Sequence, residues 1–274
     1  MKRLVKILLS QNSLTKALGL GNFFAATKFN HHLNIIDDFD FSNVLILSPH
    51  PDDEIFGLGG TMSKLIKSGA NLSVVYFCDG GAGIPQRNPK ELIKRIDKEE
   101  IGDKNKSSRT LVNIRKDEAQ KGAEVLGYKN QIFFGYEDGH LAVEASAVKA
   151  LTDLILGFKP DIIFVPSFLD NHPDHRAVNE ILINTLSKNH LKIQIWAYEV
   201  WTPIFPNRIV DITKETDLKK KAIATQVSQL KSRGYDKAIL GLNQYRAEIN
   251  GLKGFAEGFF ATTPEIYKKL YRAS

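Results

Sequence analysis

The chain has 274 residues, which is long for one α/β core but short for two ordinary domains, so we expect one domain with a C-terminal extension. Its single cysteine, Cys78, excludes an internal disulfide and favours a reducing, cytoplasmic setting. The net charge of +6 permits an anionic partner, but no recognised nucleic-acid module accompanies it, and no apolar run approaches a membrane-spanning length.

The first 41 residues are interpreted as an N-terminal extension that precedes a single main domain over residues 42–274. Lys6 interrupts the apolar part of the chain's start, so no adequate signal-peptide core remains. Apolar residues at helical spacing, with basic residues beside them, predict an amphipathic helix instead. This helix either packs on the domain's own surface, which is the commoner role, or makes peripheral contact with an anionic membrane surface.

From residue 44 onward, short apolar runs alternate with helical patterns. Strands are expected at 44–47, 72–78, 131–134, 161–165 and 193–198, and helices at 58–68, 111–126, 145–157, 176–188 and 214–230. Strands that alternate with helices form right-handed βαβ units. The sequence therefore predicts an α/β fold, with a Rossmann-like, mainly parallel sheet and helices on both faces.

A cluster of acids and one histidine follows the first predicted strand, in Ser48-Pro49-His50-Pro51-Asp52-Asp53-Glu54. Open α/β sheets bind ligands at the carboxyl ends of their strands. His50 and Asp53 could both turn toward one divalent cation, which leaves Asp52 as a base that takes a proton from water. A motif of this kind on its own is also ordinary turn chemistry.

A second cluster, Asp170-Asn171-His172-Pro173-Asp174-His175, follows the strand expected at 161–165. Two strand ends thus each carry a His-Pro-Asp element. The set His50, Asp53 and His175, with an open position for water, has the usual composition of a catalytic zinc site. Such ligands suit Zn²⁺ and also admit Fe²⁺ and Mn²⁺. Asp174 is interpreted as a residue that orients a neighbouring imidazole.

The two motifs together resemble the paired signatures of the PIG-L (LmbE-like) family of metal-dependent de-N-acetylases, from about Val44 to the C-terminus. The resemblance implies a hydrolase that removes the acetyl group from an N-acetylglucosamine-type sugar. It implies His50, Asp53 and His175 as metal ligands and Asp52 as the general base. It also implies that His172 polarises or protonates the tetrahedral intermediate.

Three further segments are similar to parts of the same family. Arg115 and Glu118 match its Arg-x-x-Glu helix, whose Arg contacts the substrate, although the pair alone indicates a helix-face ion pair. Asp138 matches a loop Asp that hydrogen-bonds sugar hydroxyls, although its neighbours alone indicate a tight loop. Near the end, Phe255–Phe259 is similar to the family's Ala-Glu-Ala-Phe segment, with Gly258 in place of the second Ala.

Basic residues outnumber acids in the segment 84–109. Such a segment is usually a solvated face or a loop, and the alternative is a lid that attracts an anionic sugar. Together with the basic N-terminus, it favours a phosphate- or lipid-linked substrate. Trp201 follows the last predicted strand, where its ring suits either core packing or the apolar face of a pyranose.

Three rival functions stay open at this stage. They are an amidase that acts on a non-sugar N-acyl substrate, a non-catalytic ligand-binding relative, and a nucleotide-dependent Rossmann enzyme. The complete set of proposed ligands and base argues against a decayed site. The lack of a Gly-x-Gly-x-x-Gly motif after the first strand argues against a dinucleotide. Neither the particular sugar nor the oligomeric state follows from the sequence.

Overall fold

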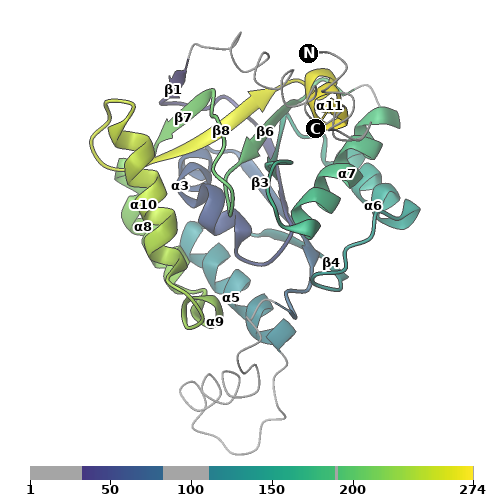
Figure 1. Cartoon of the computed structure of the whole chain (residues 1–274), viewed down its shortest axis with the longest axis horizontal. Coiled ribbons are helices and arrows are strands. Elements are labelled where there is room, and N and C mark those ends of the chain that lie inside the picture. The colour runs from purple at the N-terminus through teal and green to yellow at the C-terminus, as the bar shows by residue number, and fades with distance from the viewer. Residues whose placement is uncertain (1–32, 83–110, 189–190, 274) are drawn as a thin grey trace, which may run out of the picture.

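One sheet of eight strands organises this computed structural model, which describes residues 33–82, 111–188 and 191–273 (Figure 1). In spatial order the strands are β1 (Asn34–Ile36), β7 (Arg208–Asp211), β8 (Ala256–Thr262), β6 (Gln194–Tyr198), β5 (Ile162–Pro166), β2 (Asn43–Ser48), β3 (Asn71–Cys78) and β4 (Asn130–Tyr136). Only β8 is antiparallel to its neighbours, β6 and β7, and the other neighbouring pairs are parallel. The predicted α/β fold with a mainly parallel sheet is confirmed.

Helices cover both faces of the sheet, as predicted (Figure 1). One face packs against α3 (Asp53–Lys67), α5 (Leu111–Leu126), α8 (Thr216–Ala224), α9 (Val227–Leu230) and α10 (Tyr235–Glu248). The other face packs against α6 (Ala145–Phe158), α7 (Pro173–Lys188) and α11 (Pro264–Ala273). The central strands are continuous apolar runs because both of their faces are covered.

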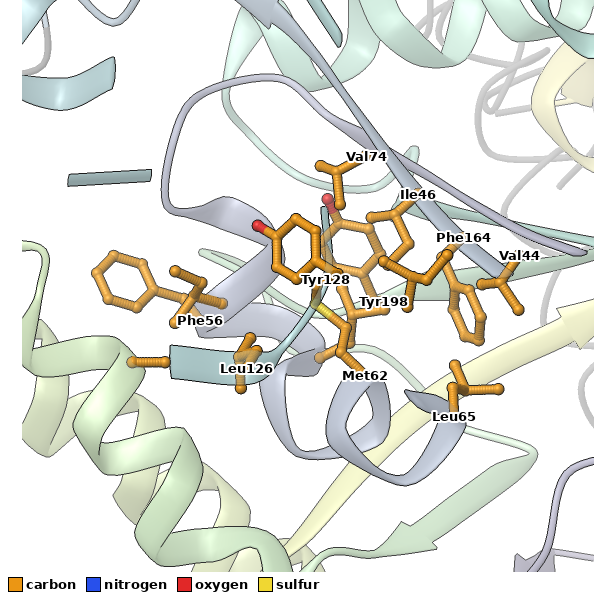
Figure 2. Packing of buried hydrophobic residues seen from close by; sticks show 14 of the residues in the cluster. Val44, Ile46, Phe56, Met62, Leu65, Val74, Leu126, Tyr128, Phe164 and Tyr198 are labelled. Carbon is orange, nitrogen blue, oxygen red and sulfur yellow. The ribbon is translucent and has the colours of Figure 1, made fainter. Parts of the chain in front are cut away.

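Alternation along β2 shows how one strand serves two cores. Val44 and Ile46 belong to the cluster that contains α3 and α5, whereas Leu45 and Leu47 belong to the cluster that contains α6 and α7. Successive side chains of a strand point to opposite faces, which explains this division. Figure 2 shows the first cluster, in which Met62 from α3 lies among side chains of the sheet.

Two helices begin earlier than the sequence predicts. α3 begins at Asp53 rather than Leu58, and α7 begins at Pro173 rather than Arg176. Acidic side chains in a first turn are favoured by the helix dipole, and proline is favoured at the first helical position, so both early starts have a local cause. The residues predicted to bind metal therefore lie at helix N-termini and not only in loops.

The C-terminal third differs more from the prediction. The single helix expected at 214–230 is wrong, because a 3₁₀ turn, Thr213–Glu215, is followed by α8 and by the separate short helix α9. The segment around Gly258 is a buried strand, β8. Both β7 and β8 extend the same sheet.

The predicted N-terminal amphipathic helix and the basic segment 84–109 lie outside the described residues. The domain boundary at residue 42 stays a prediction, and β1 places residues 34–36, which precede that boundary, in the sheet beside β7. Among the described residues, no helix is long and apolar enough to cross a membrane.

Candidate metal centre and active site

The candidate site lies at the carboxyl ends of adjacent parallel strands. β2 and β5 are neighbours, so the segments that follow them, each with a His-Pro-Asp element, lie side by side. The loop after β4 brings Asp138 to the same edge. A cavity of about 120 Å³ opens there, and its lining residues are His50, Asp52, Asp53, Arg115, Asp138, His172, Trp201, Gln229 and Tyr235.

The three predicted metal ligands converge. His50 Nδ1 lies 3.1 Å from Asp53 Oδ2, and His175 Nε2 lies 3.2 Å from the same oxygen. The ring centroids of His50 and His175 are 5.5 Å apart. One carboxylate oxygen thus lies between two imidazoles that are far apart in the sequence but close in space.

His172 and two further carboxylates offer overlapping sets of donors. One nitrogen of each of His50, His172 and His175 lies within 4.8 Å of the others. A second group with the same spacing contains one atom each of His50, Asp138, His172 and Asp174. The described residues therefore hold a cluster able to bind a cation in more than one grouping.

Burial and hydrogen bonding show that this cluster fits a metal ion. Asp53 Oδ1 and His175 Nε2 are buried and have no hydrogen-bond partner among the described residues. His175 Nε2 lies 3.2 Å from Asp53 Oδ2, but the two groups are not aligned for a hydrogen bond. Buried polar atoms are normally paired. Imidazole nitrogen and carboxylate oxygen are also the donors that Zn²⁺ and similar ions prefer.

Electrostatics agree with this fit. Burial alone would lower the pKa of His175, but Asp53 and Asp170 raise it to about 9. Burial acts in the same way on His50, and the carboxylates of Asp138, Asp174 and Asp53 raise its pKa well above the ordinary value. The acids around the two imidazoles therefore attract positive charge, which a divalent cation would also supply.

Two carboxylates hold the imidazoles from outside the central cluster. Asp174 Oδ2 lies 2.9 Å from His50 Nε2 and accepts hydrogen bonds from the backbone N–H of Gly139, while its Oδ1 accepts one from Leu141. Asp170 Oδ2 lies 3.5 Å from His175 Nδ1. Such partners orient imidazole ligands. Asp170 was missed in the sequence, although it stands five residues before His175 in the same cluster.

Asp52 occupies a strained position beside a buried arginine. Its φ of 140° is rare for any residue except glycine. Arg115 lies with Nη2 2.8 Å from Asp52 Oδ1 and donates hydrogen bonds to the carbonyls of Pro51 and Gly80. Burial raises the pKa of Asp52 to about 8, against the opposing charge of Arg115. Arg115 thus holds the predicted base, and its contact with substrate stays a prediction.

His172 and Asp138 line the cavity from two different loops, the one after β5 and the one after β4. The backbone N–H of Asp174 donates to His172 Nδ1, so a neutral His172 carries its proton on Nε2. Burial and the neighbouring histidines lower the pKa of His172, which favours this neutral form. Asp138 is 3.0 Å from His50 Nε2 and accepts a hydrogen bond from the backbone of Ala82.

An aromatic wall completes the cavity. The rings of Trp201 and Tyr235 lie 4.8 Å apart, and each is about 6 Å from Phe56. Gln229 adds an amide from α9. Sequence reasoning missed Gln229 and Tyr235, which have no motif around them. Glu118 lies behind this wall, where its carboxylate accepts hydrogen bonds from the backbone and the hydroxyl of Ser228.

Two further residues differ in how close they lie to the cluster. Cys78 is buried at the end of β3, where its side chain contacts His50. His140 is exposed and does not line the cavity.

The fold and the site together define an α/β protein with a buried His/Asp cluster able to bind a metal at the carboxyl edge of its sheet. Within that class, the model of the PIG-L family, described as GlcNAc-PI de-N-acetylase, matches residues 45–186. This match covers more than half of the chain, and the chain belongs to this family. The resemblance stated from the motifs is thereby confirmed.

Known relatives agree with the family. The chain is 27% identical over 206 residues to diacetylchitobiose deacetylase of Thermococcus kodakarensis, which covers 69% of this chain and 71% of that protein. It is 29% identical over 151 residues to a probable N-acetyl-α-D-glucosaminyl L-malate deacetylase 2 of Bacillus cereus, which covers 53% of this chain and 61% of that one.

A solved structure shares the fold. The N,N′-diacetylchitobiose deacetylase from Pyrococcus horikoshii, complexed with its inhibitor MPG, superposes with a TM-score of 0.68 at 26% identity. The superposition covers 88% of this chain and 94% of that one. The likeness therefore extends well beyond the segment that the family model matches.

Proposed function

We propose that this protein is a metal-dependent hydrolase that removes the acetyl group from an N-acetylated amino sugar. The observation that carries the proposal is the buried cluster of His50, Asp53 and His175 with Asp52 beside it at the cavity. Family membership and the similarity to sugar deacetylases support this choice of reaction. A single spare carboxylate next to a set of three donors suits hydrolysis by activated water.

Each residue of the cluster receives a role in this proposal. His50, Asp53 and His175 hold the ion, which we assign as Zn²⁺, with Fe²⁺ and Mn²⁺ as the alternatives. When bound, the ion supplies Lewis-acid polarisation of the acetyl carbonyl and lowers the pKa of water. Asp52 takes the proton of the attacking water at its carboxylate. Asp174 and Asp170 keep the two imidazoles in place.

The developing negative charge and the leaving amine need donors. His172 lines the cavity and carries its proton on Nε2, so it can donate a hydrogen bond to the oxyanion. It can pass a proton to the leaving amine only after it has itself gained a second proton, and the proton that Asp52 takes from water is the source of that proton. Arg115 stays bound to Asp52 and opposes the effect of burial on the pKa of this base. The position of Asp52 is then fixed before the substrate arrives.

The rest of the cavity suits a sugar. Trp201 and Tyr235 offer aromatic surface to the apolar face of a pyranose. Arg115 and Asp138 are proposed to bind its polar groups, because both line the cavity. The basic segments within 1–32 and 84–109 lie outside the described residues, and their charge supports two further proposals: a phosphate- or lipid-linked sugar and contact with an anionic membrane surface. The single cysteine supports the proposal of a cytoplasmic setting.

The test is acetate release by untagged protein loaded with one equivalent of Zn²⁺. The substrates are N-acetylglucosamine, N,N′-diacetylchitobiose and a set of non-sugar N-acetyl amines. We expect acetate from the sugars, and we expect Asp52→Asn to lower kcat by about 100- to 10,000-fold because it removes the general base. Metal content should stay the same in this variant.

Three other outcomes would overturn parts of the proposal. Acetate from the non-sugar amines alone would favour an amidase. Full activity in Asp52→Asn with its metal bound would contradict the role of Asp52. Protein that takes up no metal and releases no acetate would favour a non-catalytic ligand-binding relative.

A further inference from the structure

The helix that carries the acidic motif is bent. α3 runs from Asp53 to Lys67, but Leu58 has φ −143° and ψ 22°, which are not helical angles. The bend separates a first turn, with Asp53 and Glu54, from a second part that packs into the core through Met62 and Leu65 (Figure 2). A sharp bend in a helix needs an identifiable cause, such as a side chain inserted among its hydrogen bonds.

An ion pair is inserted at this bend. In a continuous α-helix, the N–H of Gly60 would donate to the carbonyl of Phe56. Here the N–H of Gly60 donates to Glu257 Oε1 at 2.9 Å, and the carbonyl of Phe56 accepts a hydrogen bond from Lys219 Nζ at 2.9 Å. The N–H of Thr61 donates to Glu257 Oε2 at 2.7 Å. The carboxylate and the ammonium thus satisfy the backbone groups that the bend exposes.

The pair is fully buried and joins distant parts of the chain. Lys219 and Glu257 are each 0% exposed, and their charged atoms are 2.6 Å apart. Asn243 Oδ1 accepts the third hydrogen bond of the ammonium. Lys219 lies on α8, Glu257 on β8 and Asn243 on α10, and α8 and α10 lie along α3 (Figure 1).

Net stability does not explain this arrangement. The desolvation of two buried charges roughly cancels their attraction, and an apolar pair of similar volume is often as stable. An apolar pair cannot accept hydrogen bonds from the N–H groups of Gly60 and Thr61, and it cannot donate one to the carbonyl of Phe56. The pair therefore specifies one conformation of α3.

We propose that Lys219 and Glu257 are positioning residues: their ion pair replaces the hydrogen bond between Phe56 and Gly60, holds the bend in α3, and thereby sets the places of Asp52 and Asp53 at the candidate metal centre. This inference rests on the proposed function for the roles of Asp52 and Asp53. The bend lies four residues from Glu54.

The test compares Lys219→Met, Glu257→Gln and the double variant with wild type. Either single change leaves a buried charge or an unpaired N–H, so both lower the midpoint of urea unfolding. The double variant removes both charges and recovers much of that midpoint. We expect it nevertheless to bind Zn²⁺ about 10- to 100-fold more weakly, measured by competition with a chromophoric chelator, as changes behind metal ligands typically do. Its kcat should fall more than its KM rises.

Lys67→Met is the matched control, because Lys67 forms an ion pair with Glu215 at the other end of the same helix. Its Zn²⁺ affinity and kcat should equal those of wild type. If the Lys219 and Glu257 variants do not fold, Asn243→Leu removes one partner of the ammonium, and a weaker Zn²⁺ affinity is expected there too. A double variant, or an Asn243→Leu protein, that folds and binds Zn²⁺ like wild type would overturn the inference.

The metal readout separates this inference from the proposed function. Wild type that binds Zn²⁺ but releases no acetate would contradict the deacetylase, whereas the comparison of Zn²⁺ affinities would still decide whether the ion pair positions the ligands. Active wild type with an unaffected double variant would contradict the ion pair's role alone.

Discussion

Asp52 is held in an unfavourable backbone conformation by the groups around it. A non-glycine residue with φ 140° costs on the order of 1–3 kcal/mol. Glu54 accepts the backbone N–H of Asp52 at 3.2 Å, and Phe56 donates its N–H to the carbonyl of Asp52 at 2.9 Å. Arg115 fixes the carboxylate. The strain persists because the backbone N–H, the carbonyl and one carboxylate oxygen of this residue are bound in place.

Glu54 is the centre of that support and allows a direct test. Its carboxylate is buried and accepts hydrogen bonds from Ser48, Tyr76 and Tyr128 in addition to Asp52. Glu54→Gln turns an amide NH₂ toward these donors, so we expect the free energy of unfolding to fall by about 1–3 kcal/mol in urea denaturation. Tyr128→Phe removes one donor and should cost less, about 1 kcal/mol. Equal stability of Glu54→Gln and wild type would contradict this support.

At the scale of elements, glycine allows α3 to lie close to the end of β6. A Cβ at Gly57 would stand 2.3 Å from Tyr198 Cδ2 and 2.8 Å from the backbone oxygen of Glu199. Neither neighbour can yield easily, because Tyr198 is fully buried and the oxygen belongs to the backbone. The close contact places the first turn of α3 over the sheet edge where the site lies.

A pair of glycine substitutions tests this contact. We expect Gly57→Ala to lower the free energy of unfolding by about 1–3 kcal/mol, because it overpacks a close contact. Gly157→Ala in α6 is the control, since a Cβ there meets nothing within 4 Å. It should stabilise the protein by up to about 1 kcal/mol, because alanine favours the helix. Urea denaturation measures both changes in the free energy of unfolding, which should have opposite signs. An unchanged free energy of unfolding in Gly57→Ala would show that α3 can move away from Tyr198.

At the scale of the whole molecule, the metal centre joins segments from distant parts of the chain. Its donors follow β2 and β5 and are supported by the loop after β4. A ligand that binds only the folded state stabilises it by about 2.7 kcal/mol at a concentration 100 times its dissociation constant. Metal binding should therefore be visible as stability of the entire domain.

Thermal unfolding tests this coupling without any substrate. Addition of Zn²⁺ to chelator-treated protein should raise Tm, and His175→Ala should abolish most of the rise because it removes a buried donor. His140→Ala is the control, since this imidazole is exposed and outside the cavity, and it should keep the full rise. A rise in Tm that is equal in both variants would place the metal elsewhere.

The local sequence determined the strands and helices that have a clear apolar pattern, and it showed which polar residues follow those strands. β2, β3 and β5 are continuous apolar runs, and α5 has its predicted bounds. Because parallel neighbours end at the same edge, the convergence of the two His-Pro-Asp segments could be predicted from strand order alone. The grouping of His50, Asp53 and His175 rested on the two His-Pro-Asp elements, and the role of His172 on the resemblance to the family.

Only the tertiary structure decided the contacts between segments whose sequences carry no strong motif or apolar pattern. β7 has four residues, and β8 contains a glycine, so neither has a strong strand signal. Lys219 and Glu257 look like solvent-exposed charges in the sequence, yet they meet in the core 38 residues apart. Gln229 and Tyr235 reach the cavity because α9 and α10 fold back over it. Pairing across such distances depends on where the backbone lies, which no local propensity encodes.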